Sequence, residues 1–275
     1  MALAQIATCP GQLRHNLDRH LDMAGRAVAA GAHLVVFPEL SVSGYLLAHG
    51  VREAAVTLDD SRLQPLRDLS RRIAMVIGVP LREEHGGISN AALLLEDGEV
   101  RGVHRKLYLP TYGMFDEGRY FVRGESLAAL ECHLGRFGVL VCEDAWHLSS
   151  AVLLARQRVD AILIVAGGPT ELDGRASPAG TRRWHWIVGA TAVTTVTPVL
   201  FANRCGWEEG ILFGGGSWGV DGRGRDLAAP ASASGETLLL ASLSRSGVRH
   251  ARTLCPIPFA ERFDLWRQAL ECSDA

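Results

Sequence analysis

The sequence has no long hydrophobic run and no strong excess of charge of either sign. No apolar stretch approaches the ~18 residues of a membrane-spanning helix, and residues 1–12 lack the basic start and apolar core of a signal peptide. The formal net charge of −2 gives no reason to expect nucleic acid or an anionic membrane as a partner. The six cysteines are scattered, without a CxxC pair. We therefore expect a cytoplasmic protein with reduced thiols, and neither a metal nor a cofactor is implied.

The chain is long enough for a large hydrophobic core. Of its 275 residues, 48% are hydrophobic and 21% are charged, which is ordinary for a globular protein. Short apolar runs predict strands, and apolar residues at helical spacing predict helices. The predicted strands cover 2–8, 34–37, 74–80, 90–95, 100–104, 161–165, 199–203, 216–220 and 237–242, and the predicted helices cover 16–30, 60–73, 144–156, 182–193 and 259–271. A strand, a helix and a strand within forty residues indicate an α/β layered fold, here as one domain over residues 1–275. The Gly/Pro-rich stretch 167–180 is expected to be a loop that borders a pocket.

Cys142 stands where a buried strand is predicted to end and a helix to begin. The apolar residues 139–141 come before it, and Glu143 and Asp144 follow directly. The positive end of a helix dipole favours a thiolate, so this elbow would suit a nucleophile. An isolated cysteine at a strand end can equally be a small buried hydrophobe, and other parts of the chain must decide.

Three further charged residues lie next to apolar or aromatic segments, where a charged side chain is unusual. Glu39 follows the apolar sequence LVVFP and so emerges at the carboxyl edge of a strand, where open α/β sheets bind ligands. Lys106 and Glu117 lie in the aromatic-rich stretch HRKLYLPTYGMFDEGRYF. Each of the three could also be an ordinary solvated side chain.

Together these residue types form a complete set for acyl transfer. A carboxylate can take the proton of a thiol and later return it to a leaving amine. A lysine ammonium and a backbone N–H beside the nucleophile can stabilise the oxyanion of the tetrahedral intermediate. The distances along the chain do not prove that Glu39, Lys106 and Cys142 meet.

Three segments in order resemble the signatures of the nitrilase, or carbon–nitrogen hydrolase, superfamily. They are FPEL around Glu39, HRKLYLP around Lys106 and VCEDAW around Cys142, and the later NRCGWEEGILFGGGSWGVDGRG also resembles this family. The resemblance implies a four-layer α-β-β-α sandwich and a homodimer or larger homo-oligomer. It implies that Cys142 is the nucleophile, Glu39 the general base and Lys106 the oxyanion stabiliser, and that Glu117 helps to position the substrate.

The residues after the cysteine bear on the branch of the family. Cys142-Glu143-Asp144 differs from the Cys-Trp-Glu typical of nitrilases, and no arginine follows shortly, as it does in N-carbamoyl amide hydrolases. The pattern most resembles the glutaminase domain of glutamine-dependent NAD synthetases. On that match Tyr112, Glu143 and Trp146 are candidate substrate-binding residues.

One departure from the glutaminase pattern concerns the amino-acid end of the substrate. Where those domains carry Asn-x-Ser-Pro, this chain has Ala-Gly-Gly-Pro at 166–169. Arg182 or Arg183 could pair with a substrate carboxylate instead, or could be an exposed helix residue. We therefore predict a free-standing amidase that acts on a small-molecule amide other than glutamine. A nitrilase, an N-carbamoyl amide hydrolase and a non-catalytic binding or regulatory module remain alternatives.

Other motifs fit less well. Residues 214–219 match GxGxxG, and residues 215–219 match GxSxG around Ser217, with Asp221 and His250 following in the order of a serine-hydrolase triad. Both motifs need a helix to follow, and a strand is predicted here. His185, between two tryptophans, is expected to be a core residue, and Cys132-His133 lacks partners at zinc spacing.

Overall fold

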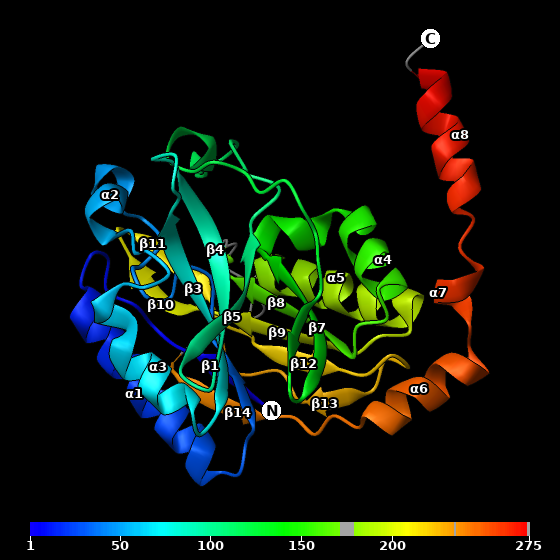
Figure 1. Cartoon of the computed structure of the whole chain (residues 1–275), viewed down its shortest axis with the longest axis horizontal. Helices are drawn as coiled ribbons and strands as arrows, with labels where there is room; N and C mark the ends of the chain where they lie inside the picture. Colours follow the sequence, from blue (N-terminus) through cyan, green and yellow to red (C-terminus); the bar gives the residue numbers. More distant parts are fainter. Residues whose placement is uncertain (171–178, 234, 274–275) are drawn as a thin grey trace.

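The structure is a computed structural model that describes residues 1–170, 179–233 and 235–273. Two six-stranded sheets lie face to face, with helices on both outer sides (Figure 1). The first sheet has the order β14 (Thr237–Leu240), β1 (Ala2–Gln5), β2 (Leu34–Val36), β3 (Ala74–Arg82), β4 (Ile88–Glu96), β5 (Glu99–Arg105). The second has the order β13 (Asp226–Ala228), β12 (Trp218–Val220), β9 (Val199–Asn203), β8 (Ala161–Ala166), β7 (Gly135–Val141), β6 (Leu130–Cys132). A small separate hairpin pairs β10 (Cys205–Glu208) with β11 (Ile211–Gly214). The predicted four-layer α-β-β-α sandwich is confirmed.

The central strands are apolar on both faces because both faces are covered. In β2, Leu34 and Val36 pack with residues of the second sheet, whereas Val35 packs under α1 (Leu13–Ala29) and α3 (Gln64–Ser70). Strands β1, β2 and β3 run parallel, as do β7, β8 and β9. Parallel strands buried in this way read as continuous hydrophobic runs, and that is why the sequence predicted them. On the far side α4 (Leu148–Arg156) and α5 (Ala179–Thr195) cover the second sheet.

Several predicted boundaries are wrong for local reasons. The helix predicted over 144–156 is a 3₁₀ turn, η4 (Cys142–Trp146), followed by α4, because the backbone at His147 is extended. The helix predicted over 60–73 is likewise two pieces, η2 (Ser61–Leu63) and α3, which has a proline in its first turn. The last helix divides into α7 (Ile257–Ala260) and α8 (Phe263–Ser273) at an extended Glu261.

The other differences are short elements and one strand start. Strand β12 begins at Trp218 rather than at residue 216, because Gly215 and Gly216 have φ of 52° and 68°. Six elements were not predicted from the sequence: α2 (Val51–Ala54), α6 (Arg245–Leu254), β6, β10, β11 and β13. Of the predicted loop 167–180, residues 171–178 lie outside the described residues and α5 begins at Ala179. The single domain over 1–275 stays a prediction.

Candidate active site

Two sharp backbone bends stand beside the two sheets. Cys142 directly follows β7 and has φ of 46°, and Leu40, directly after Glu39, has the same value. A left-handed conformation is costly for residues with a Cβ and persists only where the surrounding structure enforces it. Both bends follow the carboxyl ends of buried strands, β7 and β2, and thus bring Glu39 and Cys142 to the same end of the sandwich.

Glu39, Lys106 and Glu117 form a buried cluster of charges. The Lys106 Nζ atom lies 2.7 Å from Glu39 Oε1 and 2.7 Å from Glu117 Oε1. Asn90 on β4 donates to Glu39 Oε1 at 2.8 Å, and the Gly167 amide donates to Glu39 Oε2 at 2.8 Å. These bonds hold the Glu39 carboxylate in one orientation, because each of its oxygens accepts a fixed donor.

The charged groups of this cluster shift one another's pKa values. Burial by itself would lower the pKa of Lys106, but the carboxylates of Glu39 and Glu117 outweigh burial and raise the pKa, so the lysine stays an ammonium. Burial raises the pKa of Glu117 to about 7, against the opposing effect of Lys106. Tyr45 donates its hydroxyl hydrogen to Glu117 Oε1.

Cys142 is buried beside the same charges, and its surroundings favour the neutral thiol. Burial and then the negative charge of Glu39 raise its pKa well above the usual value, and Lys106 only partly offsets them. The expected thiolate at a helix N-terminus is therefore wrong: Cys142 begins a 3₁₀ turn of only five residues, and burial has the larger effect on the pKa of the thiol. The side chain keeps 7% exposure. A protonated thiol requires a base, and Glu39 is the adjacent carboxylate.

Asp144 ties the cysteine bend to the lysine segment. Its Oδ1 accepts the amides of Leu107 and Tyr108 at 2.9 and 3.1 Å. Its Oδ2 accepts the Val141 amide at 3.0 Å and lies 2.8 Å from His104 Nε2. One fully buried carboxylate thus fixes the chain on both sides of the site.

The candidate substrate-binding residues lie further out than the cluster. The Tyr112 hydroxyl donates to both carboxylate oxygens of Glu143, at 3.0 and 2.9 Å, and Tyr112 is 57% exposed. Both residues line a cavity of about 500 Å³ that also contains Leu107, directly after Lys106. Trp146 is 42% exposed and meets Trp184 edge to face at 5.6 Å. The exposed Arg182 stacks on Trp186 at 5.6 Å, and no contact within the described residues joins it to the charged cluster.

Several residues of the site were missed at the sequence level. Asn90 gave a usable signal, because it is a polar residue inside an apolar run, and Asp144 gave one by following the cysteine bend. Tyr45 and Gly167 gave none, since only the folded chain brings them to Glu39 and Glu117. The site also needs a buried support: Arg204 pairs with Glu208, whose carboxylate accepts the Tyr45 amide at 2.6 Å.

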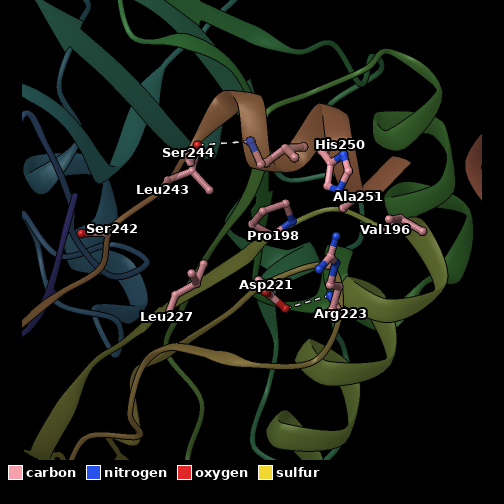
Figure 2. A pocket seen from close by; sticks show the side chains of 13 residues that line it. Val196, Pro198, Asp221, Arg223, Leu227, Ser242, Leu243, Ser244, His250 and Ala251 are labelled. Atoms are coloured by element: carbon pink, nitrogen blue, oxygen red, sulfur yellow. Dashed lines mark hydrogen bonds between the residues drawn. The ribbon is translucent and has the colours of Figure 1, made fainter. Parts of the chain in front are cut away.

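The Ser217 motif does not form a triad. Ser217 is fully buried, its hydroxyl accepts the Asn203 amide at 3.0 Å, and its own amide donates to Gln5 at 3.0 Å. Figure 2 shows Asp221 and His250 in a separate pocket of about 280 Å³, of which Ser217 is not a lining residue. There the Asp221 carboxylate accepts the amides of Arg223 and Arg225, so it serves a turn.

Comparisons with known proteins identify the family of this chain. The family model for carbon–nitrogen hydrolases matches residues 1–253. A glutamine-dependent NAD(+) synthetase of Acinetobacter baylyi is 31% identical over 224 residues, which are 79% of this chain and 39% of that protein. This chain therefore spans about two fifths of that relative's length.

Solved structures give the same result for the fold. The glutamine-dependent NAD+ synthetase from Acinetobacter baumannii, in complex with ADP, matches with a TM-score of 0.76 and 30% identity over 86% of this chain and 44% of that chain. A mutant of the amidase from Nesterenkonia sp. AN1 matches with a TM-score of 0.80 and 27% identity over 97% of this chain and 95% of that chain. That mutant carries the acetamide moiety of fluoroacetamide, added covalently at the active-site cysteine. With the family model matching most of its length, this chain belongs to the carbon–nitrogen hydrolase family.

Proposed function

We propose that the protein is an amidase that hydrolyses the C–N bond of a small non-peptide amide through an acyl-thioester on Cys142. The observation that carries the proposal is the buried contact of Lys106 with both Glu39 and Glu117, whose charges also act on the buried Cys142 thiol. This is the arrangement that a thiol nucleophile with a carboxylate base needs.

In the first half-reaction the Cys142 sulfur attacks the amide carbon while the Glu39 carboxylate takes the thiol proton. A C–S bond forms, and the carbonyl oxygen becomes an oxyanion. Lys106 stabilises that charge together with the first backbone N–H of η4, because the amides that begin a helical turn have no partner within it. Glu39 then passes its proton to the nitrogen, the C–N bond breaks, and ammonia or an amine leaves.

In the second half-reaction Glu39 takes a proton from water, and the oxygen attacks the thioester carbon. The C–S bond breaks, the carboxylic acid leaves, and the sulfur recovers its proton from Glu39. Glu117 keeps Lys106 in place and is itself held by Tyr45.

Glutamine is the second candidate substrate. It is favoured by the similarity to glutamine-dependent NAD(+) synthetases, with 31% identity in the A. baylyi protein. The small-amide assignment is favoured by the amidase from Nesterenkonia sp. AN1, which this chain matches over 97% of its own length. A nitrile as substrate and a non-catalytic binding role are the remaining alternatives.

The test is Cys142→Ala, compared with Cys132→Ala as a control outside the cluster. A panel of small aliphatic amides, glutamine and nitriles is assayed for ammonia and acid. We expect Cys142→Ala to lower turnover by roughly 10⁴-fold or more, because removing one member of a catalytic unit disables the unit. Intact-mass spectrometry with fluoroacetamide should show an adduct on the wild type and on Cys132→Ala only. Unchanged turnover in Cys142→Ala would refute the mechanism, whereas turnover of glutamine or nitriles alone would change the substrate.

We also propose a cytoplasmic homodimer. All six cysteines are free thiols, which supports the cellular setting, and no helix in the described ranges is long and apolar enough to cross a membrane. For the dimer, the support is apolar side chains exposed on the helical layer, namely Leu148, Leu153, Trp186 and Val193. Helix α8 projects from the body of the molecule (Figure 1) and exposes Leu265 and Leu270, which a second copy would cover.

A further inference from the structure

Helix α6 carries three arginines on one face. Arg245, Arg249 and Arg252 are spaced four and three residues apart, so their side chains lie on neighbouring turns of the same side. Like charges at this spacing repel one another and destabilise a helix. The stripe therefore opposes the stability of the helix, which Ser244 caps by accepting the Gly247 amide at 3.1 Å.

Two more arginines complete the wall of a cavity. Arg136 comes from the start of β7, and Arg158 from the turn before β8, where it has φ of 60°. The cavity has a volume of about 610 Å³, and its other lining residues are Asp160, Thr253, Pro256 and Phe259. This volume is within the range of small-molecule sites. We call it the arginine pocket.

The arginines exceed the acids near them. Arg245 lies 3.2 Å from Asp160, and Arg136 lies 2.8 Å from Glu131 at the rim. Arg249 and Arg158 form no ion pair with any residue that the structure describes. Five guanidinium groups thus face two carboxylates, an excess of three positive charges in a chain of net charge −2.

Arg252 is the buried arginine of the pocket, and hydrogen bonds hold its guanidinium in place. It is 7% exposed, and its acceptors are neutral: the Val159 carbonyl at 2.7 Å, the Thr197 hydroxyl at 2.8 Å and the Val196 carbonyl at 3.3 Å. A buried guanidinium without a carboxylate partner is costly, and a bound anion would relieve that cost. The carbonyls also fix the guanidinium plane, so the site is built before a ligand arrives.

We propose that the arginine pocket binds a small molecule with two or more linked phosphate groups. A guanidinium fork matches phosphate oxygens in pairs, and a single carboxylate would leave most of the excess charge unpaired. Phe259, over which the Arg158 guanidinium lies at 5.4 Å, gives the pocket an apolar wall for an organic group. The pocket is separate from the amidase site: Arg136 and Asp160 stand where β7 and β8 begin, and Cys142 and Gly167 stand where the same strands end. Seven residues of extended strand put about 20 Å between the two sites.

The experiment is isothermal titration calorimetry of the full chain with inorganic pyrophosphate, orthophosphate, a nucleoside diphosphate and a hexaglutamate peptide. Wild type is compared with Arg249→Glu, and with Arg14→Glu, which makes the same charge change at an exposed arginine on α1. We expect pyrophosphate to bind roughly tenfold more tightly than orthophosphate, and Arg249→Glu to weaken it by roughly tenfold. Arg14→Glu should leave both values within about twofold, and the affinity should fall as salt rises towards ~0.15 M.

Each ligand has a distinct meaning. If the nucleoside diphosphate binds more tightly than pyrophosphate, and Phe259→Ala removes the difference, the ligand is a phosphate ester whose organic part contacts the apolar wall. Equal affinities identify the phosphates alone as the recognised group. No pyrophosphate binding at millimolar concentration, equal binding by wild type and Arg249→Glu, or tighter binding of hexaglutamate would each overturn the proposal.

Discussion

Glu117 is a site residue whose pKa the fold shifts towards neutral pH. Burial raises the pKa of its carboxyl to about 7, from 4.5, and the nearby Glu39 charge adds to burial while Lys106 opposes it. Between these two values the folded state binds more protons than the unfolded state. This carboxyl therefore contributes stability that is complete below pH 4.5 and is lost as the pH rises through 7.

The Glu117→Gln variant should remove this dependence. Denaturant unfolding from about pH 5 to about pH 8 should show a free energy of unfolding that falls less with pH in Glu117→Gln than in wild type, by a few kcal/mol at most over the range. Glu125→Gln, at an exposed glutamate, should keep the wild-type slope. Parallel curves for wild type and Glu117→Gln would mean that the carboxyl does not titrate as described.

At the scale of elements, Asp144 joins the end of β7 to the segment after β5. Asp144→Ala would leave the buried Val141 amide and the partly buried amides of Leu107 and Tyr108 without their acceptor. Each unsatisfied buried group costs about 1–3 kcal/mol, so we expect a loss of about 3 kcal/mol or more in the free energy of unfolding.

The same change should slow acylation of Cys142, since the bend and the lysine segment would no longer be tied together. The measurements are denaturant unfolding and the rate of adduct formation with fluoroacetamide. Asp18→Ala, at an exposed acid on α1, is the matched control and should leave both nearly unchanged. Asp144→Asn keeps an oxygen acceptor and should recover part of the adduct rate, and a full rate in Asp144→Ala would contradict the positioning role.

Strand β3 approaches the backbone bend at Glu39 very closely at Gly78. A Cβ on Gly78 would stand 2.4 Å from both the Pro38 carbonyl oxygen and the Leu40 nitrogen, which are backbone atoms that cannot turn aside. Gly78→Ala should therefore push Glu39 away from Lys106. We expect a loss of about 2 kcal/mol of stability and of at least about tenfold in turnover.

Gly25, in helix α1 on the outside of the first sheet, has open space around it, in contrast to Gly78. A Cβ there, in the middle of α1, meets nothing within 4 Å. Gly25→Ala should stabilise the protein by about 0.5–1 kcal/mol and leave turnover unchanged, because alanine is the better helix former. If Gly78→Ala behaved like Gly25→Ala in both measurements, the close contact at Glu39 would not control the site.

For the whole molecule, the prediction concerns self-association. Trp186 is 64% exposed on α5, and α8 extends beyond the sandwich (Figure 1). Sedimentation equilibrium should give twice the chain mass for wild type. Trp186→Lys should shift the equilibrium to the monomer by roughly tenfold or more, as expected when an aromatic side chain at an interface is replaced by a charge. Trp207→Lys, at a tryptophan 63% exposed on the β10 strand, is the control; dissociation by both, or by neither, would argue against this face.

The sequence by itself determined most of the layers. The apolar runs became buried strands because both faces of the two sheets are covered, and Glu39 and Cys142 could be placed at strand ends for the same reason. It could not divide the helices at His147 or Glu261, because a single extended residue leaves the hydrophobic period almost unchanged. Nor could it find α6, where only Val248, Ala251 and Arg252 are buried.

Only the tertiary structure decided the chemistry of the site. A helix N-terminus at Cys142 predicted a thiolate, but burial and the charge of the distant Glu39 raise the pKa of the thiol. The hydrogen bonds that Asn90 and Gly167 donate to Glu39, and that Tyr45 donates to Glu117, likewise depend on contacts between distant segments. Local residue patterns are set by neighbours along the chain, whereas a pKa and a hydrogen-bond geometry are set by neighbours in space.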